Sequence, residues 1–547
     1  MSKIELISNK YPFVDISTPE VLLKRAENLR QNGNVTAALR IASDLKLIFP
    51  CSLDIGWLIG RCHVQLQNWH AAITVFQELL EIQHDQCGLH NELSAVYLEI
   101  GDVKKALEHI CLEIQYSPQN HEYHYNKGLI LEQNGDLKNA IDSISQAIKL
   151  SEGFAWGYCE RGRLYYLQNN LDAAEKDLVH ATSINSMFPE ALHNLSLVYL
   201  ERGNFASKIE NEKKALSIQP NYVAAQYGLA TITMLLGEYE KGFQLYESRK
   251  NRPGHKKLKA RLKLNEWLGF ENIQKKHLIV VSEQGLGDII QFSRFVLEAS
   301  KVTKRVTFEV PVSLVDLLLP LFFGTNVKLV TSTIKQNSND FICALCSLPL
   351  ALMNYSESNF FVEGKAYIRA DQDRRLKWEK VLDKNKFNIA VNWQGSKADI
   401  DRNRSFDLSY LKELSKIPGV KLISVQKGFG VEQILKLKGS VSISDLGEEL
   451  DKDAAFLDTA ALIEMCDLTV TSDTSIAHLA GALGVKCFVA LKQVPDWRWG
   501  YTENTTPWYN SLELFRQTEF NDWAGVFNRI VARVEDLAAQ KCSPARD

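Results

Sequence analysis

The sequence lacks any strong excess of charge and any long apolar segment. Its 63 basic and 66 acidic residues leave a net charge of -3, so the overall charge attracts neither nucleic acid nor an anionic membrane. The longest strongly apolar run, Val315–Phe323, is much shorter than the roughly 20 residues of a membrane-spanning helix. The first residues show no basic start followed by an apolar run, as a secretory signal would. We therefore expect a cytoplasmic protein with no transmembrane segment and no nucleic-acid partner.

Patterns typical of metal sites and of serine hydrolases are also missing. Cys343 and Cys346 lack a second pair of ligands, and the histidines of the C-terminal half, His255, His277 and His478, lie far apart in the sequence. This spacing argues against zinc. No GxSxG motif is present to mark a serine nucleophile. We expect no metal ion and no cofactor.

A repeat of 34 residues occupies the first half of the chain. Seven units begin at residues 19, 53, 87, 121, 155, 189 and 223, and this period is typical of helical-hairpin repeats. A small residue is required where two helices cross closely, and the eighth place of each unit is small: Ala26, Gly60, Ser94, Gly128, Gly162, Ser196 and Ala230. Residues 19–254 therefore resemble tetratricopeptide repeats, which implies a stacked superhelix with a concave groove.

The groove of such an array is expected to bind a protein or peptide. Relatives that clamp a peptide backbone carry asparagine sixth in each unit, whereas this chain has Lys24, Leu58, Glu92, Asn126, Glu160, Asn194 and Gly228 there. An asparagine ladder is thus not expected. The alternative is that the array only stiffens the protein or joins copies of it into a homo-oligomer. The sixth unit departs from the pattern, because Lys208 stands in its twentieth place, where the other units have alanine or glycine.

The second half alternates short apolar runs with helical segments, the pattern of parallel α/β units. Seven strands are predicted, at 277–282, 306–310, 327–330, 389–393, 421–425, 468–471 and 487–491. They fall into two groups, so we predict two doubly wound, Rossmann-like lobes that face a cleft. The expected organisation is a leader (1–18), seven repeats (19–254), a basic linker (255–275), an N-terminal acceptor-side lobe (276–370), a C-terminal nucleotide-sugar-side lobe (371–520), and a closing helix with a tail (521–547).

Polar residues follow four of the predicted strands. The first motif, SEQGLGDIIQ, places Gly285, Gly287 and Asp288 at a strand end before a helix. Its glycines allow close approach of a ligand to the backbone, but it lacks the third glycine of a dinucleotide site, which makes a nicotinamide enzyme the weakest alternative. Asp288 is the candidate catalytic residue, and its alternative role is to stabilise the start of the helix.

The other three motifs are candidates for donor binding. VTSDTSIAHLAGALG begins a helix that could receive a diphosphate at its N-terminus, and an ordinary N-cap is the alternative reading. VNWQGSKADIDRNRSF adds arginines able to hold phosphates, and ISVQKGFG ends another strand. The candidate donor-binding residues are Gly285, Gly287, Trp393, Gln394, Gly395, Arg404, Gln426, Lys427, Asp473, Thr474, Ser475 and His478.

Together these motifs resemble glycosyltransferase family 9, the lipopolysaccharide heptosyltransferases, over roughly residues 276–530. The resemblance implies a GT-B fold, with Asp288 as general base and Asp473 at the turn that holds the diphosphate and sugar of the donor. The layout of repeats followed by a transferase is similar to O-GlcNAc transferase and to bacterial repeat-bearing glycosyltransferases. It implies a metal-independent, inverting transfer of a hexosyl or heptosyl group from a nucleotide sugar to a hydroxyl of a protein acceptor.

Two alternatives stay open. The acceptor could be a glycan or a lipid-linked glycan, as for a heptosyltransferase, or the chain could be a catalytically inactive scaffold that works through its repeats. The segment WRWGYTENTTPWY is not part of the heptosyltransferase pattern. Its residues Trp497, Trp499 and Trp508 could stack on a sugar or a base, although a buried core is the commoner role of such aromatic residues.

Overall fold

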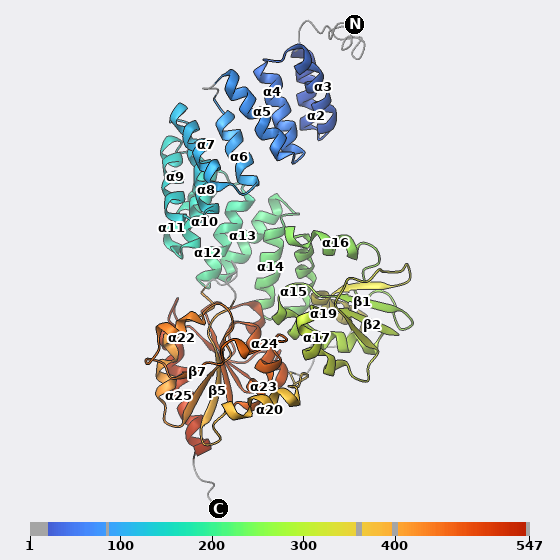
Figure 1. Ribbon diagram of the computed structural model, residues 1–547, viewed down its shortest axis with the longest axis vertical. Coiled ribbons are helices and arrows are strands. Elements are labelled where there is room, and N and C mark those ends of the chain that lie inside the picture. The colour runs from blue at the N-terminus through green and yellow to red at the C-terminus, as the bar shows by residue number, and fades with distance from the viewer. Residues whose placement is uncertain (1–19, 84–86, 357–363, 396–402, 543–547) are drawn as a thin grey trace, which may run out of the picture. The chain divides into compact units, whose positions relative to one another are not determined.

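The structure is a computed structural model that describes residues 20–83, 87–356, 364–395 and 403–542. The chain forms two compact units, Met1–Val198 and Tyr199–Asp547. The first unit is helical, and the second contains the end of the helical array and two α/β lobes (Figure 1). The division falls within the sixth repeat rather than at residue 254, so the last helices of the array belong structurally with the α/β region.

Seven consecutive helix pairs follow the seven units of the repeat, which confirms the predicted superhelix at the N-terminus. Their bounds are α2 Glu20–Gln31, α3 Val35–Ile48, α4 Leu53–Gln65, α5 Trp69–Ile82, α6 Leu89–Glu99, α7 Val103–Tyr116, α8 His121–Gln133, α9 Leu137–Leu150, α10 Ala155–Leu167, α11 Leu171–Ile184, α12 Pro189–Glu201, α13 Phe205–Ile218, α14 Val223–Leu235 and α15 Tyr239–Tyr246. The turn inside each hairpin needs a left-handed residue, which most units supply as glycine. Two units lack that glycine, and there Gln67 and Asn169 adopt the conformation, each with φ of 60°.

The departure in the sixth unit has a structural reason. The ammonium group of Lys208, which is 1% exposed, forms an ion pair of 2.8 Å with Glu212, which is 0% exposed. Gly228 of the next unit makes room for this pair, because a Cβ at that position would lie 2.2 Å from Glu212 Oε1. Lys208 therefore remains buried with its charge compensated.

The second unit contains two sheets in which all strand pairs are parallel. One has the order β3-β2-β1-β4 and the other β10-β9-β8-β5-β6-β7. Their bounds are β1 His277–Val281, β2 Arg305–Glu309, β3 Val327–Val330, β4 Phe341–Ala344, β5 Phe387–Asn392, β6 Val420–Ser424, β7 Ile443–Ser444, β8 Leu468–Ser472, β9 Cys487–Leu491 and β10 Leu512–Arg516. The seven predicted strands are confirmed within two residues, and β4, β7 and β10 were missed.

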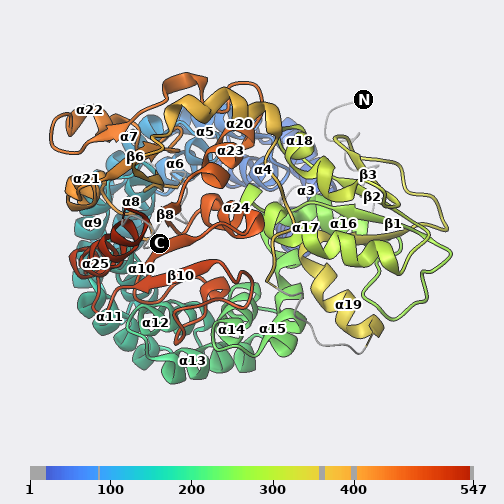
Figure 2. The ribbon, with the colours of Figure 1, turned by 90° about the horizontal axis from the view of Figure 1, so that it is seen from below.

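Two helices begin at the strand ends that form the candidate site, and a third helix closes the second sheet. α17 (Leu286–Lys301) follows β1, α24 (Ser475–Leu483) follows β8, and the two helices lie side by side (Figure 2). α24 is the helix predicted in the motif VTSDTSIAHLAGALG, and Gly484 ends it with φ of 72°. The closing helix α25 (Trp523–Cys542) packs on the core of the second sheet through Val526, Phe527 and Ile530.

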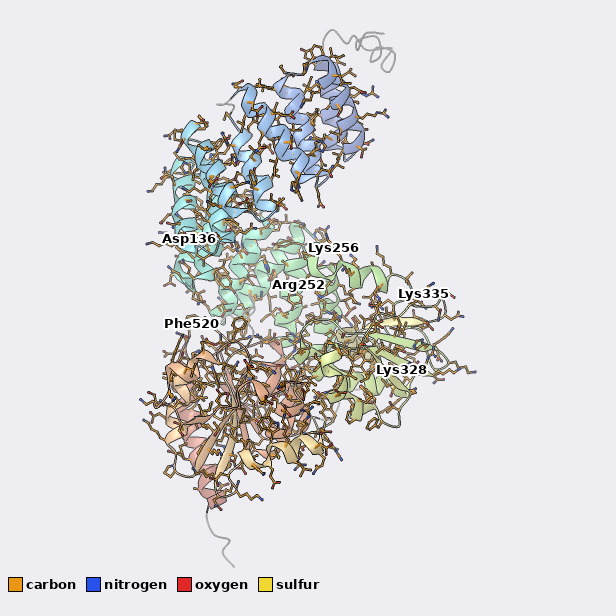
Figure 3. The ribbon with its side chains drawn as sticks, in the orientation of Figure 1. Asp136, Arg252, Lys256, Lys328, Lys335 and Phe520 are labelled. Carbon is orange, nitrogen blue, oxygen red and sulfur yellow. The ribbon has the colours of Figure 1, made fainter. Side chains whose placement is uncertain are left out.

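Residues 255–275, predicted as a linker, are part of the first lobe. They begin with α16 (Lys256–Leu262), and the fully buried Trp267 donates its backbone N–H to the Ile342 carbonyl at 2.8 Å, beside β4. Arg252, just before this segment, places its guanidinium 4.7 Å from the centre of the Tyr227 ring (Figure 3). In the described residues, no helix is both long and apolar enough to cross a membrane.

Substitution of Gly60 by valine should destabilise the first unit. A Cβ at Gly60 would lie 2.3 Å from Cε1 of Phe76, whose ring is fully buried, and overpacking of this kind costs about 1–3 kcal/mol. We expect faster hydrogen exchange in peptides from α4 and α5. Gly153→Val is the matched control, because no heavy atom lies within 4 Å of a Cβ there. Equal exchange in the two variants would contradict the packing argument.

Candidate functional site

A cleft of about 610 Å³ opens at the carboxyl ends of the second sheet, a volume suited to a small ligand. Residues after β5 and β6, the loop 451–456 and the start of α24 line it, and Val312, Ser313 and Asp316 line it from the first lobe. Six of the predicted site residues are among the lining: Gln394, Gly395, Gln426, Lys427, Thr474 and Ser475. The structure thus brings the last three sequence motifs together at one cleft.

The N-terminus of α24 is one wall of this cleft. Thr474 is its N-cap, and its hydroxyl oxygen accepts from the backbone N–H of Ile476 at 3.3 Å. The N-cap is therefore present, at Thr474, and the first residues of the helix still line the cleft. The positive end of the helix can receive an anion such as a diphosphate there.

Gln426 and Trp393 hold the strand ends together. The Gln426 carboxamide oxygen accepts from the Trp393 and Gln394 backbone N–H groups, each at 3.0 Å, and its nitrogen donates to the Phe429 carbonyl at 2.7 Å. The indole of Trp393 is fully buried and donates to the Gly430 carbonyl at 3.2 Å. These hydrogen bonds fix the segments after β5 and β6 that line the cleft.

Asn392 is a site residue that the sequence analysis missed. Asn392 is 4% exposed. Its side-chain oxygen accepts from the hydroxyl of Thr474 at 2.9 Å and from the hydroxyl of Thr471 at 3.1 Å. Its side-chain nitrogen donates to the side-chain oxygen of Gln426 at 2.8 Å. It therefore ties β5, β6 and the start of α24 to one another. A polar amide at the end of a run of buried apolar residues, AVN, was the signal that could have revealed it.

Two basic residues stand close to the cleft. Lys427 lines it, and its ammonium group donates to the carbonyls of Leu450 and Asp451 at 2.7 and 2.6 Å, which holds the loop on the far side. Arg404 lies against Gly395, since a Cβ there would be 2.9 Å from a guanidinium nitrogen. The other arginine of that motif, Arg402, lies outside the described residues.

Asp288 does not line the cleft. One of its oxygens accepts the backbone N–H of Gly285 at 3.0 Å, and the other forms a short ion pair with Arg498. Arg498 also donates to Gln291 at 2.9 Å and to Asp496 at 2.8 Å. Burial raises the pKa of Asp288, and Arg498 opposes the rise. The predicted base is therefore engaged by a cation that the sequence analysis did not single out.

Asp473 lies near the same group of charges. Burial, together with the negative charge of Asp496, raises the pKa of Asp473 to about 6, against the effects of Trp499 and Arg404. Part of its surface remains exposed. Its carboxyl group can therefore change protonation near neutral pH.

His478 is buried between aromatic rings. It is 5% exposed, it stacks on Trp499 with the ring centres 5.1 Å apart, and its Nδ1 lies 3.1 Å from the hydroxyl of Tyr509. Burial, with Arg498 nearby, lowers the pKa of His478 well below the usual value, which favours the neutral ring. Gly287 lets α17 approach it, because a Cβ there would lie 3.1 Å from His478 Cδ2 and 3.3 Å from Ser475 Cα.

The tryptophans of residues 497–508 belong to the core. Trp497, Trp499 and Trp508 are exposed by 2%, 0% and 2%. Trp497 packs edge to face on Phe243 of the last repeat with ring centres 5.7 Å apart. The packing role weighed in the sequence analysis is the one that the structure supports.

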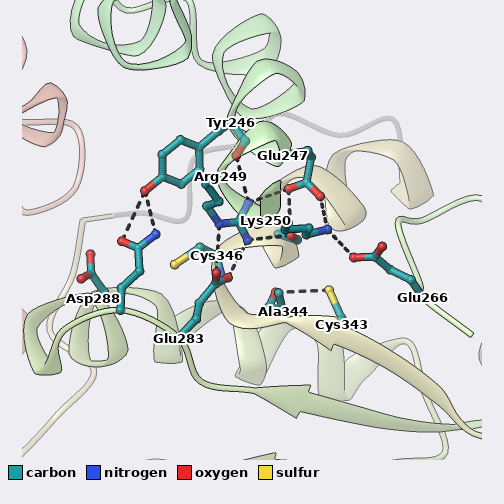
Figure 4. A network of polar contacts seen from close by, with 12 residues as sticks. Tyr246, Glu247, Arg249, Lys250, Glu266, Glu283, Asp288, Cys343, Ala344 and Cys346 are labelled. Carbon is teal, nitrogen blue, oxygen red and sulfur yellow. Dashed lines mark hydrogen bonds and ion pairs between the residues drawn. The ribbon is translucent and has the colours of Figure 1, made fainter. Parts of the chain in front are cut away.

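The last repeat also supports the glycine loop of the first motif (Figure 4). Gln284, with φ of 66°, donates from its amide to the hydroxyl of Tyr246 at 2.9 Å. The fully buried guanidinium of Arg249 pairs with Glu283 at 2.5 Å and donates to Ser347 at 2.8 Å. The end of the repeat array thus positions the residues that precede Asp288.

A family model described as "Tetratricopeptide repeat" matches residues 121–154. Among curated proteins, the chain is 22% identical over 533 residues to Protein FlbA of Caulobacter vibrioides, which covers 93% of this chain and 83% of that one. It is 24% identical to BBSome complex member BBS4 of Bos taurus, covering 35% and 37%, and 24% identical to human Protein O-mannosyl-transferase TMTC3, covering 33% and 21%. The chain spans only a minor part of the length of BBS4 and of TMTC3.

Solved structures that resemble the chain include MamA, with 23% identity, 30% of this chain and 95% of that one covered and a TM-score of 0.28. Another is YrrB, entitled a TPR protein with an unusual peptide-binding site, with 17% identity, 34% and 96% coverage and a TM-score of 0.28. The chain is a tetratricopeptide-repeat protein with an N-terminal repeat superhelix. More particularly, it is similar to FlbA along nearly its whole length.

Removal of Arg498 should destabilise the second unit, because Asp288 would keep a largely buried charge without its partner. Breaking such a pair costs about 3 kcal/mol or more. We expect Arg498→Met to lower the free energy of unfolding by about that amount, and Asp288→Asn added to it to restore part of the loss. Urea unfolding of the single and double variants measures this coupling. Strictly additive losses would show that the pair is not coupled.

The stability of the protein should depend on Asp473 near neutral pH. Because folding raises its pKa from 3.8 to about 6, the neutral form is favoured in the folded state, and its contribution is fully present below pH 4 and lost as the pH rises through 6. Asp473→Asn should therefore gain thermal stability relative to the unsubstituted protein between pH 4 and 7. Asp373→Asn, at an exposed position of α20 (Gln372–Trp378), is the control. A constant difference across this range would contradict the shift.

Proposed function

We propose that this protein is a metal-independent, inverting glycosyltransferase that moves a sugar from a nucleotide-sugar donor to an acceptor hydroxyl. The observation that carries the proposal is the cleft of about 610 Å³ at which the N-terminus of α24 meets the ends of β5 and β6. Parallel α/β sheets bind ligands at this edge. A helix N-terminus there is suited to the negatively charged diphosphate of such a donor.

The diphosphate would contact the start of α24 at Thr474 and Ser475. Arg404 and Lys427 lie near enough to the cleft to compensate the charge that grows on the leaving group. The acceptor oxygen attacks the anomeric carbon, the bond from that carbon to the diphosphate oxygen breaks, and the nucleoside diphosphate leaves with the bonding electron pair. The proton of the acceptor hydroxyl passes to a carboxylate, and Asp288 is the residue proposed for this step.

The ion pair with Arg498 affects that step. Both oxygens of Asp288 are occupied, one by Gly285 and the other by Arg498. Each oxygen keeps a second lone pair that can take a proton, but the positive charge of Arg498 makes the carboxylate a weaker base.

The same ion pair favours a second candidate function, a scaffold without catalysis. In a scaffold the Asp288–Arg498 pair would serve structure alone, and the repeats would carry the function. The names of two relatives support either reading, because one is a member of a protein complex and another is a protein O-mannosyl-transferase. As a transferase, the chain would receive its acceptor as a protein or peptide bound by the repeats. A glycan or lipid-linked acceptor is the alternative.

A nucleotide-binding experiment separates the two functions. The protein is heated with ADP, UDP, GDP or CDP, and a ligand at 100 times its dissociation constant should stabilise it by about 2.7 kcal/mol. We expect a selective shift with at least one of the four. Ser475→Asp should weaken that binding by about tenfold or more, because it puts a negative charge where the diphosphate lies. An acid at the first position of a helix is favourable for folding, so this variant should remain stable.

Gln372→Asp is the matched control, since it adds the same charge at the first position of α20, which does not line the cleft. Release of a nucleoside diphosphate from the corresponding nucleotide sugar then tests for transfer to a co-purified partner. If none of the four nucleotides shifts the unfolding transition, the transferase proposal is wrong and the scaffold is favoured.

A further inference from the structure

A phenylalanine at the lip of the cleft is held in place by its backbone. Phe429 follows β6 and lines the cleft, and its side chain is 48% exposed. Single exposed apolar residues are common and need no functional reason. Phe429 differs from such residues in how rigidly the loop around it is fixed and in what lies beside it.

The backbone on both sides of Phe429 requires glycine. Gly428 and Gly430 have φ of 73° and 91°, a region that other residues rarely adopt. A Cβ at Gly430 would also lie 2.8 Å from Gln394 Oε1 and 3.0 Å from Trp393 Nε1. Bulkier residues are therefore excluded at this position by space as well as by conformation.

Three hydrogen bonds pin the same loop. The Phe429 carbonyl accepts from the Gln426 amide at 2.7 Å, the Gly430 carbonyl accepts from the Trp393 indole at 3.2 Å, and the Gly430 N–H donates to Glu432 at 2.9 Å. The exposed ring is thus presented from a fixed backbone, which lowers the conformational entropy lost when a flat ligand packs against it.

The surroundings suit a nucleotide. The N-terminus of α24, which would bind the diphosphate, and Val312 of the first lobe, which is 77% exposed, both line the same cleft. An aromatic ring can stack on any nucleobase, because every base has a π face. We propose that Phe429 stacks on the base of the nucleoside diphosphate, and this inference rests on the proposed donor site.

Calorimetric titration with ADP, UDP, GDP, CDP and inorganic pyrophosphate tests the inference. Phe429→Ala should weaken the binding of the nucleoside diphosphate by about 10- to 100-fold, the range found for loss of one base–aromatic stack. Its affinity for pyrophosphate should stay unchanged, because pyrophosphate has no base. Phe429→Trp should keep the affinity, and the fluorescence of the added indole should be quenched by the nucleotide.

Phe520→Ala is the matched control, since Phe520 is similarly exposed, at 43%, and does not line the cleft (Figure 3). If Phe429→Ala binds the nucleotide within about twofold of the unsubstituted protein, the stacking role is wrong while the donor site stands. An equal loss of nucleotide and pyrophosphate binding would also overturn it, because the variant would then have damaged the cleft as a whole. If no nucleoside diphosphate binds the unsubstituted protein, the proposed function and this inference fail together.

Discussion

The ion pair between Arg498 and Asp288 is the contact on which the second unit depends most. It joins the start of α17 in the first lobe to the segment that follows β9 in the second. The neighbours of Arg498 extend the junction, because Trp497 packs on Phe243 of the last repeat and Trp499 stacks on His478 of α24. Three parts of the chain therefore meet around one largely buried guanidinium, whose charge must remain compensated.

This arrangement connects the last repeat to the cleft. Tyr246 and Arg249, at the end of the array, bond to Gln284 and Glu283 just before the glycine loop. Gly287, in the first turn of α17, lies against Ser475, the first residue of α24. A short series of contacting residues thus joins the last repeat to the wall of the cleft. Whether the chain is a transferase or a scaffold, the end of its repeats and its α/β lobes form one structural unit.

Much of the fold was predictable because it depends on local patterns. The 34-residue period predicted the helix pairs. Short apolar runs followed by polar turns predicted most strands of the two sheets. β4 was missed because its four apolar residues, Phe341–Ala344, run into another apolar stretch, and periodicity alone cannot separate a buried strand there from a helix. Gln67 and Asn169 stand where the other units have the turn glycine, so the repeat register locates these turns, although neither residue type by itself indicates a left-handed conformation.

The candidate site was predictable in part. The carboxyl ends of parallel strands meet at one edge of a sheet, so the sequence was enough to predict that Gln394, Gln426 and Thr474 lie near one cleft. It could not reveal that Gln426 is engaged by backbone groups, or that Asn392 joins three strand ends, because those contacts form between residues distant in the sequence.

By itself, the sequence determined the repeat superhelix, the two groups of parallel strands and the helix that starts at Ser475, since each follows from short-range periodicity and capping. Only the tertiary structure decided the state of the charged residues. Asp288 meets Arg498 across 210 positions of the chain, and the burial that raises the pKa of Asp473 comes from segments packed around it. Charge pairing and desolvation depend on which distant segments fold together, and local sequence does not encode that directly.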